Sequence, residues 1–406
     1  SGDEPLARRA HAAYCLVLAE DRAYGHVSGP APEPALGPPG PAGKSGAAAP
    51  WLEQFEVERE NFRAALEWAI ERGEAEWGLR LAGALLQYWD EREHQDEGRA
   101  FLEKLLALPA AAARTRLRAR GLFALSVLSV DLPAARELHE KSLEISRELE
   151  DARGTAVALN AIAVCAQKEG KLEESRSFFE KSLVLWKNLG DPVAVARALS
   201  NLASVARLQG RLAEARSLFE ECLSLSRQLG DRTGAAWALN QQGDVAREQG
   251  DTAGARRLYE EGLSKFRDAG DRWGIAGSLA DLGYLAREQG DLDAADRLYA
   301  ESLAAFQELD YKRGIAKTLD AFAGSAALRS RAQRALRLAG AASALRHGLG
   351  AVLAPAEQAR LEKDLEPARA SLTNTEGAAA WMEGWSMPLE EAIREAAGQE
   401  KEEFEI

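Results

Sequence analysis

Small and hydrophobic residues recur along the middle of the chain with a period of 40 residues. Four segments align without gaps, at residues 151–190, 191–230, 231–270 and 271–310. In the first half of each segment a leucine is followed four positions later by a small residue and three positions after that by alanine, as in Leu159, Ala163 and Ala166. This spacing places the three residues on one face of a helix, where small side chains let a second helix approach closely.

A second helical pattern follows a glycine in each segment. These glycines suit the left-handed position that ends a helix, and they are Gly170, Gly210, Gly250 and Gly290. The second pattern carries an aromatic residue four positions after a small one, and the aromatics are Phe179, Phe219, Tyr259 and Tyr299. We expect their rings to fill the space that the small residues leave, so all four are predicted core residues. Asp191, Asp231 and Asp271 open the segments that follow and are predicted helix N-caps.

The repeat resembles the tetratricopeptide repeat, whose usual pattern is W-x2-L-G-x2-Y, then A-x3-F, then P. The chain keeps the alanine, glycine and aromatic positions, but leucine replaces the tryptophan, alanine the tyrosine, and Gly-Asp the proline. HEAT and armadillo repeats share the period without the A-x3-[FY] signature after a glycine. The resemblance implies an all-α protein, a right-handed superhelical α-α solenoid of 40-residue tetratricopeptide units with helical caps, and helix boundaries that recur every 40 residues within about two residues.

Weaker copies of the pattern at each end extend the predicted repeat region to residues 111–350. Before it we expect a helix at 1–23, a flexible linker rich in proline, glycine and alanine at 24–50, and a helical region at 51–110. The helices of that region are predicted at 51–73, 74–92 and 96–108. After it, residues 351–406 are predicted to form a helical cap with an acidic tail, in which Trp381 and Trp385 are core residues.

Charge and cysteine content narrow the class of protein. The net charge is −13, from 51 basic and 64 acidic residues, and direct nucleic-acid binding is not expected because it needs a surplus of Lys and Arg. Cys15, Cys165 and Cys222 lie far apart and are predicted to be buried thiols. No apolar run reaches the roughly 18 residues of a membrane span. We therefore expect a cytoplasmic protein without a membrane partner.

Motifs for catalysis or cofactor binding are not complete. Gly43-Lys44-Ser45 resembles the end of a phosphate-binding loop, but Pro38 stands where that loop needs glycine, and we expect no ATP binding. The five histidines show no zinc-ligand spacing, and no nucleophile lies in a recognisable motif. The prediction is that the chain is not an enzyme and has no catalytic residues, no metal site and no cofactor.

The flanks of the array resemble a second, larger family. Upstream these motifs are Trp51, Leu52, Phe55, residues 61–66 and Trp68, and downstream they are residues 337–342, 355–357, 380–381 and 389–393. They are similar to the C-terminal half of bacterial STAND-type "predicted ATPase" regulators related to MalT-like and LuxR-type activators. The resemblance implies a non-catalytic sensor that binds a ligand or protein and relays this to the ATPase domain of a parent protein. The ATPase core has no counterpart here, and a stand-alone adaptor for protein–protein interaction, or an enzyme that uses the groove, remains an alternative.

The variable face of each first helix would line the concave groove of a tetratricopeptide solenoid. The predicted groove residues are Asn160, Arg207, Trp237, Asn240, Asp244, Arg247, Tyr284 and Arg287. The three arginines recur at the repeat period, and a row of exposed guanidinium groups suits a carboxylate, a phosphate or an acidic peptide. We expect the arginines to supply affinity and the other residues specificity for a protein, peptide or small effector. The alternative is that Arg247 pairs with Asp244 on its own helix and the row is only solvated.

Overall fold

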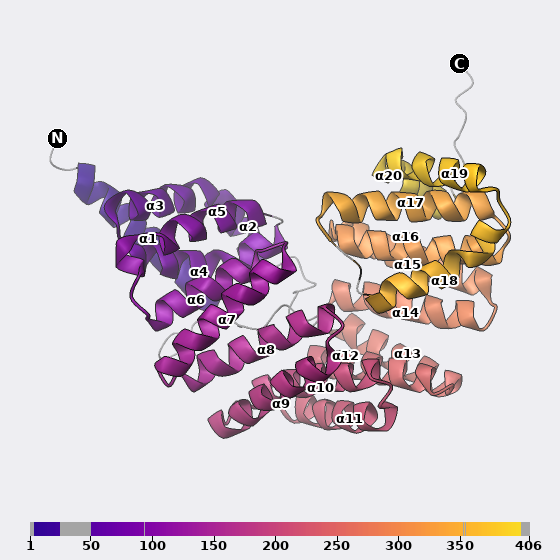
Figure 1. The fold of residues 1–406 in the computed structure, drawn as a ribbon, viewed down its shortest axis with the longest axis horizontal. Helices are drawn as coiled ribbons and strands as arrows, with labels where there is room; N and C mark the ends of the chain where they lie inside the picture. The colour runs from indigo at the N-terminus through magenta and orange to yellow at the C-terminus, as the bar shows by residue number, and fades with distance from the viewer. Residues whose placement is uncertain (1–3, 25–49, 93, 352, 354, 399–406) are drawn as a thin grey trace, which may run out of the picture. The chain divides into compact units, whose positions relative to one another are not determined.

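The computed structural model describes residues 4–24, 50–92, 94–351, 353 and 355–398 (Figure 1). In these ranges every regular element is helical and no strand occurs. Residues 25–49 of the predicted linker, including the Gly-Lys-Ser motif, and the acidic tail at 399–406 lie outside them. The chain divides into two compact units within helix α10 (Pro192–Leu208): unit 1 holds most residues up to Val205, and unit 2 most residues from Ala206.

Helix boundaries in the repeat region confirm the 40-residue period. The first helices of the 40-residue repeats are α8 (Ala152–Lys168), α10, α12 (Arg232–Glu248), α14 (Arg272–Glu288) and α16 (Lys312–Leu328). The second helices are α9 (Leu172–Leu189), α11 (Leu212–Gln228), α13 (Thr252–Ala269), α15 (Leu292–Glu308) and α17 (Ala332–Gly348). Each series starts at positions 40 residues apart, so the predicted all-helical solenoid is confirmed and its regular boundaries continue through 311–350.

Caps and core residues explain why the same helices form each time. The carboxylates of Asp231 and Asp271 accept the backbone N–H of Gly234 and Gly274 at 2.8 and 2.9 Å. The four glycines that separate the two helices of each repeat have φ between +73° and +81°, in the left-handed region, as predicted. All four predicted core aromatics are fully buried, and a Cβ atom added to Gly243 would lie 2.6 Å from the ring of Tyr259. The ring therefore fills the space that the small residue leaves.

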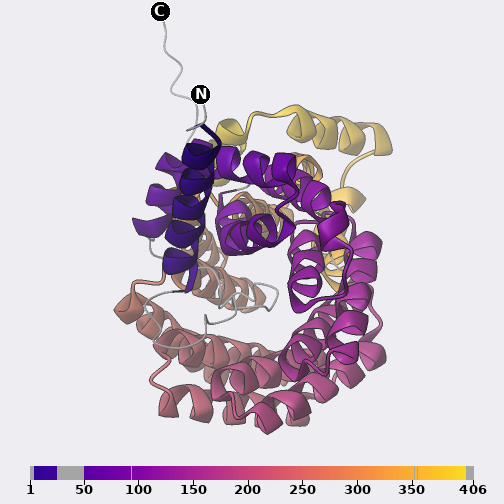
Figure 2. The same cartoon turned by 90° about the vertical axis from the view of Figure 1, so that its left-hand side faces the viewer.

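Unit 1 begins with a group of helices (Figure 2), which packs around a core that contains several aromatic residues. Helix α1 (Glu4–Tyr24) contacts α3 (Arg59–Arg72) and α4 (Ala75–Glu91). The prediction of one helix over 51–73 was wrong, because the chain bends at Glu58 and separates α2 (Pro50–Val57) from α3. The bend lets Phe55 turn inward, where its ring lies 5.1 Å from Phe62 and 5.8 Å from Tyr88. The unit continues with α5 (Gln95–Leu106), α6 (Arg116–Val127) and α7 (Leu132–Glu148).

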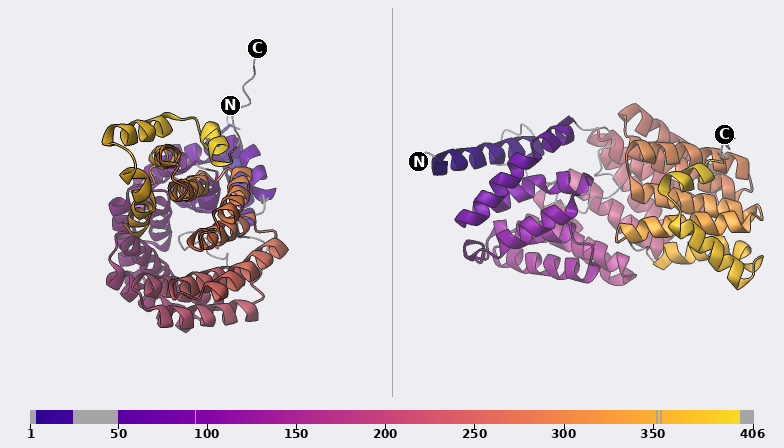
Figure 3. Two further views of the ribbon diagram at one scale, coloured as in Figure 1. Left: turned by 90° about the vertical axis from the view of Figure 1, so that its right-hand side faces the viewer. Right: turned by 90° about the horizontal axis from the view of Figure 1, so that it is seen from above.

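Unit 2 ends in three helices that pack on its last repeat (Figure 3). They are α18 (Pro355–Ala370), α19 (Asn374–Ser386) and α20 (Leu389–Ala396). Helix α19 crosses α17 so closely that a Cβ atom on Gly384 would overlap the backbone of Arg337. Trp381 is partly buried, but the prediction that Trp385 is a core residue was wrong: it is 37% exposed and lies against the ring of His347 at the surface.

Candidate functional site

Charged and aromatic side chains of unit 2 lie together on one face of the first helices of its repeats. The face, here called the charged face, is formed by Asp244 and Arg247 of α12, Asp281, Tyr284 and Arg287 of α14, and Lys317 and Asp320 of α16. Spacings of three residues place these side chains together on each helix. Two residues of α18, Arg360 and Asp364, reach the same face.

The predicted row of arginines is a set of ion pairs between consecutive repeats. Arg207 pairs with Glu248, and Arg247 with Glu288 at 2.8 Å, so that each guanidinium binds the acid 41 residues further along. Arg287 lacks this partner because the equivalent position is Leu328. It binds Asp364 of α18 instead, at 2.7 Å. The arginines therefore hold neighbouring elements of unit 2 together.

The expectation that these arginines are exposed was wrong. Arg287 is 6% exposed, and the side chains of Arg207 and Arg247 are 20% and 18% exposed. Each arginine side chain packs against the neighbouring helix, because its aliphatic stem buries apolar surface there while its guanidinium group keeps an acidic partner. Asp244 lies within 4.0 Å of Arg207 and accepts a hydrogen bond from the Tyr259 hydroxyl at 2.7 Å. Burial of that hydroxyl raises the pKa of Tyr259.

Three other predicted groove residues lie in contacts between helices. Asn160, in unit 1, is buried, and its side-chain oxygen accepts the Asn201 amide at 3.0 Å. Asn240 is buried too and donates to the Ser278 hydroxyl at 2.7 Å. The ring of Trp237 packs against Phe266 and Trp273, with centroids 4.8 and 4.9 Å apart. These contacts orient the repeats.

Burial raises the pKa of two carboxyl groups of the charged face. Burial raises the pKa of Asp281 to about 6; Lys317 opposes this rise and Asp244 adds to it. Burial likewise raises the pKa of Asp320 to about 6, although Arg346 binds it. Sequence reasoning missed Asp281, although its position varies between repeats, from Asn201 to Gln241 to Asp281, which is the available signal.

Tyr284 is the centre of the cationic part of the face. The Arg287 guanidinium carbon lies 4.2 Å from its ring centroid and that of Arg360 lies 4.8 Å away. The Tyr284 hydroxyl donates to the Asp364 carboxylate at 2.8 Å. Sequence reasoning missed Arg360 and Asp364 because they belong to a helix outside the repeat pattern.

A cysteine, a histidine and an asparagine lie close together in unit 1. The Cys15 sulfur lies 3.7 Å from His11 Nε2, which in turn lies 3.3 Å from the Asn61 side-chain oxygen. Cys15 is fully buried, and burial raises the pKa of its thiol to about 11. The thiolate is therefore disfavoured, and the grouping is not poised to attack a substrate.

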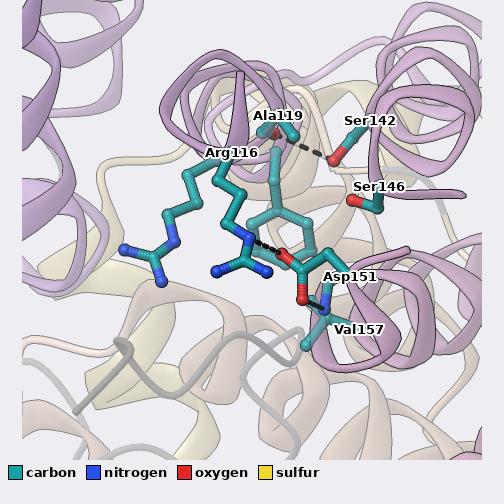
Figure 4. Close-up of a pocket in the computed structure, with 9 residues that line it drawn as sticks. Arg116, Ala119, Ser142, Ser146, Asp151 and Val157 are labelled. Atoms are coloured by element: carbon teal, nitrogen blue, oxygen red, sulfur yellow. Dashed lines mark hydrogen bonds and ion pairs between the residues drawn. The ribbon is translucent and has the colours of Figure 1, made fainter. Parts of the chain in front are cut away.

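A small pocket in unit 1 lies between α6, α7 and α8 (Figure 4). Arg116 reaches Asp151 at 3.4 Å, and the Ser142 hydroxyl donates to the Ala119 carbonyl at 2.9 Å. The cavity volume of about 20 Å³ has room for about one water molecule, which is too little for an organic ligand. The residues that the structure describes contain no group of three or more His, Cys, Asp or Glu side chains able to hold a metal ion. None of their helices is long and apolar enough to cross a membrane.

Several solved structures have the same fold. A Rap protein complexed with competence and sporulation factor is 14% identical (TM-score 0.55; 85% of this chain and 99% of that chain covered). Aspartyl phosphate phosphatase F from Bacillus subtilis is 12% identical (TM-score 0.53; 94% and 100% covered). A STAND protein with a tetratricopeptide repeat sensor, from Pyrococcus horikoshii, is 15% identical (TM-score 0.50; 79% and 50% covered). At these identities the likeness shows the fold alone.

Sequence comparison identifies the repeat itself. No curated protein sequence matches the chain. Models of the tetratricopeptide repeat match residues 131–188, 194–268 and 275–309. Repeats of this type are typically non-catalytic scaffolds for protein interaction. The chain therefore contains a tetratricopeptide-repeat region, built as an all-helical solenoid.

Proposed function

We propose that the chain is a non-catalytic sensor or scaffold that binds a protein or peptide segment on the charged face of unit 2. The observation that carries the proposal is helix α18, a segment of the chain itself that already lies on this face. Its Asp364 side chain binds Tyr284 and Arg287, and its Leu365 is fully buried. A face that holds one helical segment through a charged anchor and an apolar contact has the chemistry to hold another.

The parent context is part of the same proposal. We propose that the region reports ligand binding to the ATPase domain of a STAND-type regulator, as the upstream and downstream motifs suggest. The likeness to a STAND protein with a tetratricopeptide repeat sensor, and to a Rap protein complexed with competence and sporulation factor, supports this role. A stand-alone adaptor would use the same face. The net charge of −13 argues against nucleic acid as the direct partner in either case.

The predicted groove residues divide into two roles in this proposal. Asp244, Arg247, Tyr284 and Arg287 belong to the binding face, and Arg207 extends the row of ion pairs beside it. Asn160, Trp237 and Asn240 act indirectly, because their contacts set the orientation of the helices.

A displayed library of random peptides, panned against the whole chain, tests the proposal. Peptides that bind the charged face should lose at least tenfold in affinity for a Lys317→Glu variant, since this exposed lysine lies beside Asp281. A matched Arg257→Glu variant changes an exposed charge on the second helix α13 and should bind them normally. Circular dichroism checks that both variants fold, and Lys317→Gln replaces the first if it does not. Peptides that bind both variants equally, or a library that yields no binder, would reject the proposal.

A further inference from the structure

The row of cross-repeat ion pairs ends differently from how it begins. The first two arginines bind Glu248 and Glu288 of the repeat that follows. At the third, the repeat that follows offers Leu328, which is 53% exposed and has no charge. The repeats therefore leave Arg287 without an acid in register. The negative charge comes from outside the array, on Asp364.

The surroundings of Arg287 form a site shaped for an anion. Arg287 Nη2 and the Tyr284 hydroxyl both donate to the same oxygen, Oδ2 of Asp364, at 2.7 and 2.8 Å. The guanidinium lies over the Tyr284 ring and against Gly324 of α16. A Cβ atom at residue 324 would overlap Arg287 Nη1, so any larger residue there would require the guanidinium to move.

Two donors at this site have no acceptor. Nη1 of Arg287 and the hydroxyl of Tyr299 are both buried without a hydrogen-bond partner. One repeat earlier, the Tyr259 hydroxyl has Asp244 as its acceptor. The residue equivalent to Asp244 is Tyr284, so the Tyr299 hydroxyl loses that acceptor. Buried donors are rarely left unpaired, and these two donors point to an anion whose oxygens reach atoms that the Asp364 carboxylate does not reach.

Helix α18 is held by few apolar contacts. Among the residues of α18 whose burial the structure describes, the buried hydrophobic ones are Leu361, Leu365 and Ala368, and most of the other side chains are exposed. Pro367 lies inside the helix and removes one backbone donor near its end. A helix with this small apolar footprint depends strongly on its charged anchor.

We infer that Tyr284, Arg287 and Tyr299 form a recognition site for an Asp or Glu side chain on a helical segment of a partner protein, and that Asp364 occupies this site as an internal ligand which the partner displaces. The inference rests on the proposed function and names the chemistry of the partner. A partner carboxylate that reaches deeper than Asp364 would also accept from Arg287 Nη1 and the Tyr299 hydroxyl. The partner is then preferred over α18 because it satisfies donors that α18 leaves unpaired.

Hydrogen–deuterium exchange of the whole chain tests the internal ligand. Asp364→Arg places a positive charge against Arg287 and should release α18, raising amide exchange across residues 357–370 at least tenfold. Asp364→Asn removes the anion with little change of shape and should act in the same direction. The matched control is Glu366→Arg, which reverses an exposed acid on the same helix and should leave the exchange unchanged.

A labelled synthetic peptide of residues 355–370 tests recognition in trans. Its fluorescence anisotropy should report binding to the Asp364→Arg chain at least tenfold tighter than to the wild-type chain, whose own α18 competes. A peptide carrying Asp364→Asn should bind at least tenfold more weakly than the unchanged peptide, and one carrying Glu366→Gln should bind like it. Adding Arg287→Lys to the Asp364→Arg chain should weaken binding, because Lys cannot keep the planar contact with Tyr284.

Each other outcome overturns the inference. If α18 exchange is unaltered in both Asp364 variants, Asp364 is not the anchor. If α18 is released but the peptide does not bind, or binds equally with Asn at residue 364, the site does not recognise a carboxylate. If inorganic phosphate alone binds and displaces the peptide, the site serves a small anion. None of these results decides the peptide-library experiment, which reads binding at Lys317, so failure of the inference and failure of the proposed function are distinguishable.

Discussion

The Asp281 carboxyl group provides the sharpest test of the electrostatics on the charged face. Burial raises its pKa from 3.8 to about 6, which corresponds to a free-energy difference of about 3 kcal/mol. Between these two values the folded state binds more protons at this site than the unfolded state does. The contribution of Asp281 to stability is therefore present at low pH and is lost as the pH rises through about 6. Above that pH, the partly buried carboxylate is charged and destabilises the fold.

Asp281→Asn resembles the protonated group and should remove this penalty. The expected gain in unfolding free energy is about 1 kcal/mol near pH 4.5 and up to about 3 kcal/mol at pH 7.5. Asp320 keeps its own shifted pKa, so the variant should show a reduced pH dependence rather than none. Native-state hydrogen exchange of the α14 amides measures the local stability of this part of unit 2.

The control for this experiment is Asp268→Asn, at an exposed position on α13. It should change stability by less than about 0.5 kcal/mol at either pH. A loss of stability in Asp281→Asn at pH 7.5, or a gain of the same size at both pH values, would refute the reasoning. The first result would mean that attraction to Lys317 outweighs burial of the charge, and the second that the effect is independent of ionisation.

Three further predictions follow from the same structure. Gly324→Ala should lower the unfolding free energy by about 1–3 kcal/mol in thermal or urea unfolding, because the added Cβ overlaps Arg287 Nη1. The control Gly348→Ala has open space around the added Cβ and should be neutral or slightly stabilising, so equal effects of the two changes would argue against the close contact. Tyr259→Phe should lower the unfolding free energy by about 1 kcal/mol, because it deletes the hydroxyl that donates to Asp244. Tyr299→Phe removes a hydroxyl without an acceptor and should leave the stability unchanged, and the reverse order in urea unfolding would contradict the hydrogen-bond assignment. Cys15 and Cys222 are buried, and burial raises the pKa of each thiol to about 11. Iodoacetamide at pH 8 should therefore label these cysteines far more slowly in the native chain than in the urea-unfolded chain. Comparable labelling rates by mass spectrometry would show that the thiols are accessible.

Local features of the fold could be predicted from the sequence because every repeat encodes them again. The aspartate caps, the left-handed glycines and the buried aromatics depend on residues within one unit, and four aligned copies make the pattern unmistakable. The prediction failed where a single copy had to be interpreted. The bend at Glu58 and the exposure of Trp385 depend on neighbours that no repeat pattern reveals.

The candidate site was only partly predictable, for a different physical reason. The 40-residue period is enough to predict that Arg207, Arg247 and Arg287 recur on one helix face. Whether an arginine on that face is solvated or paired depends on which side chains the next element brings to it. The partner of Arg287 lies 77 residues away on α18, a helix without the repeat pattern. The raised pKa of Asp281 likewise depends on burial among α12, α16 and α18. These properties depend on how the helices pack, because burial and charge pairing arise between helices, whereas a periodic pattern describes one helix at a time.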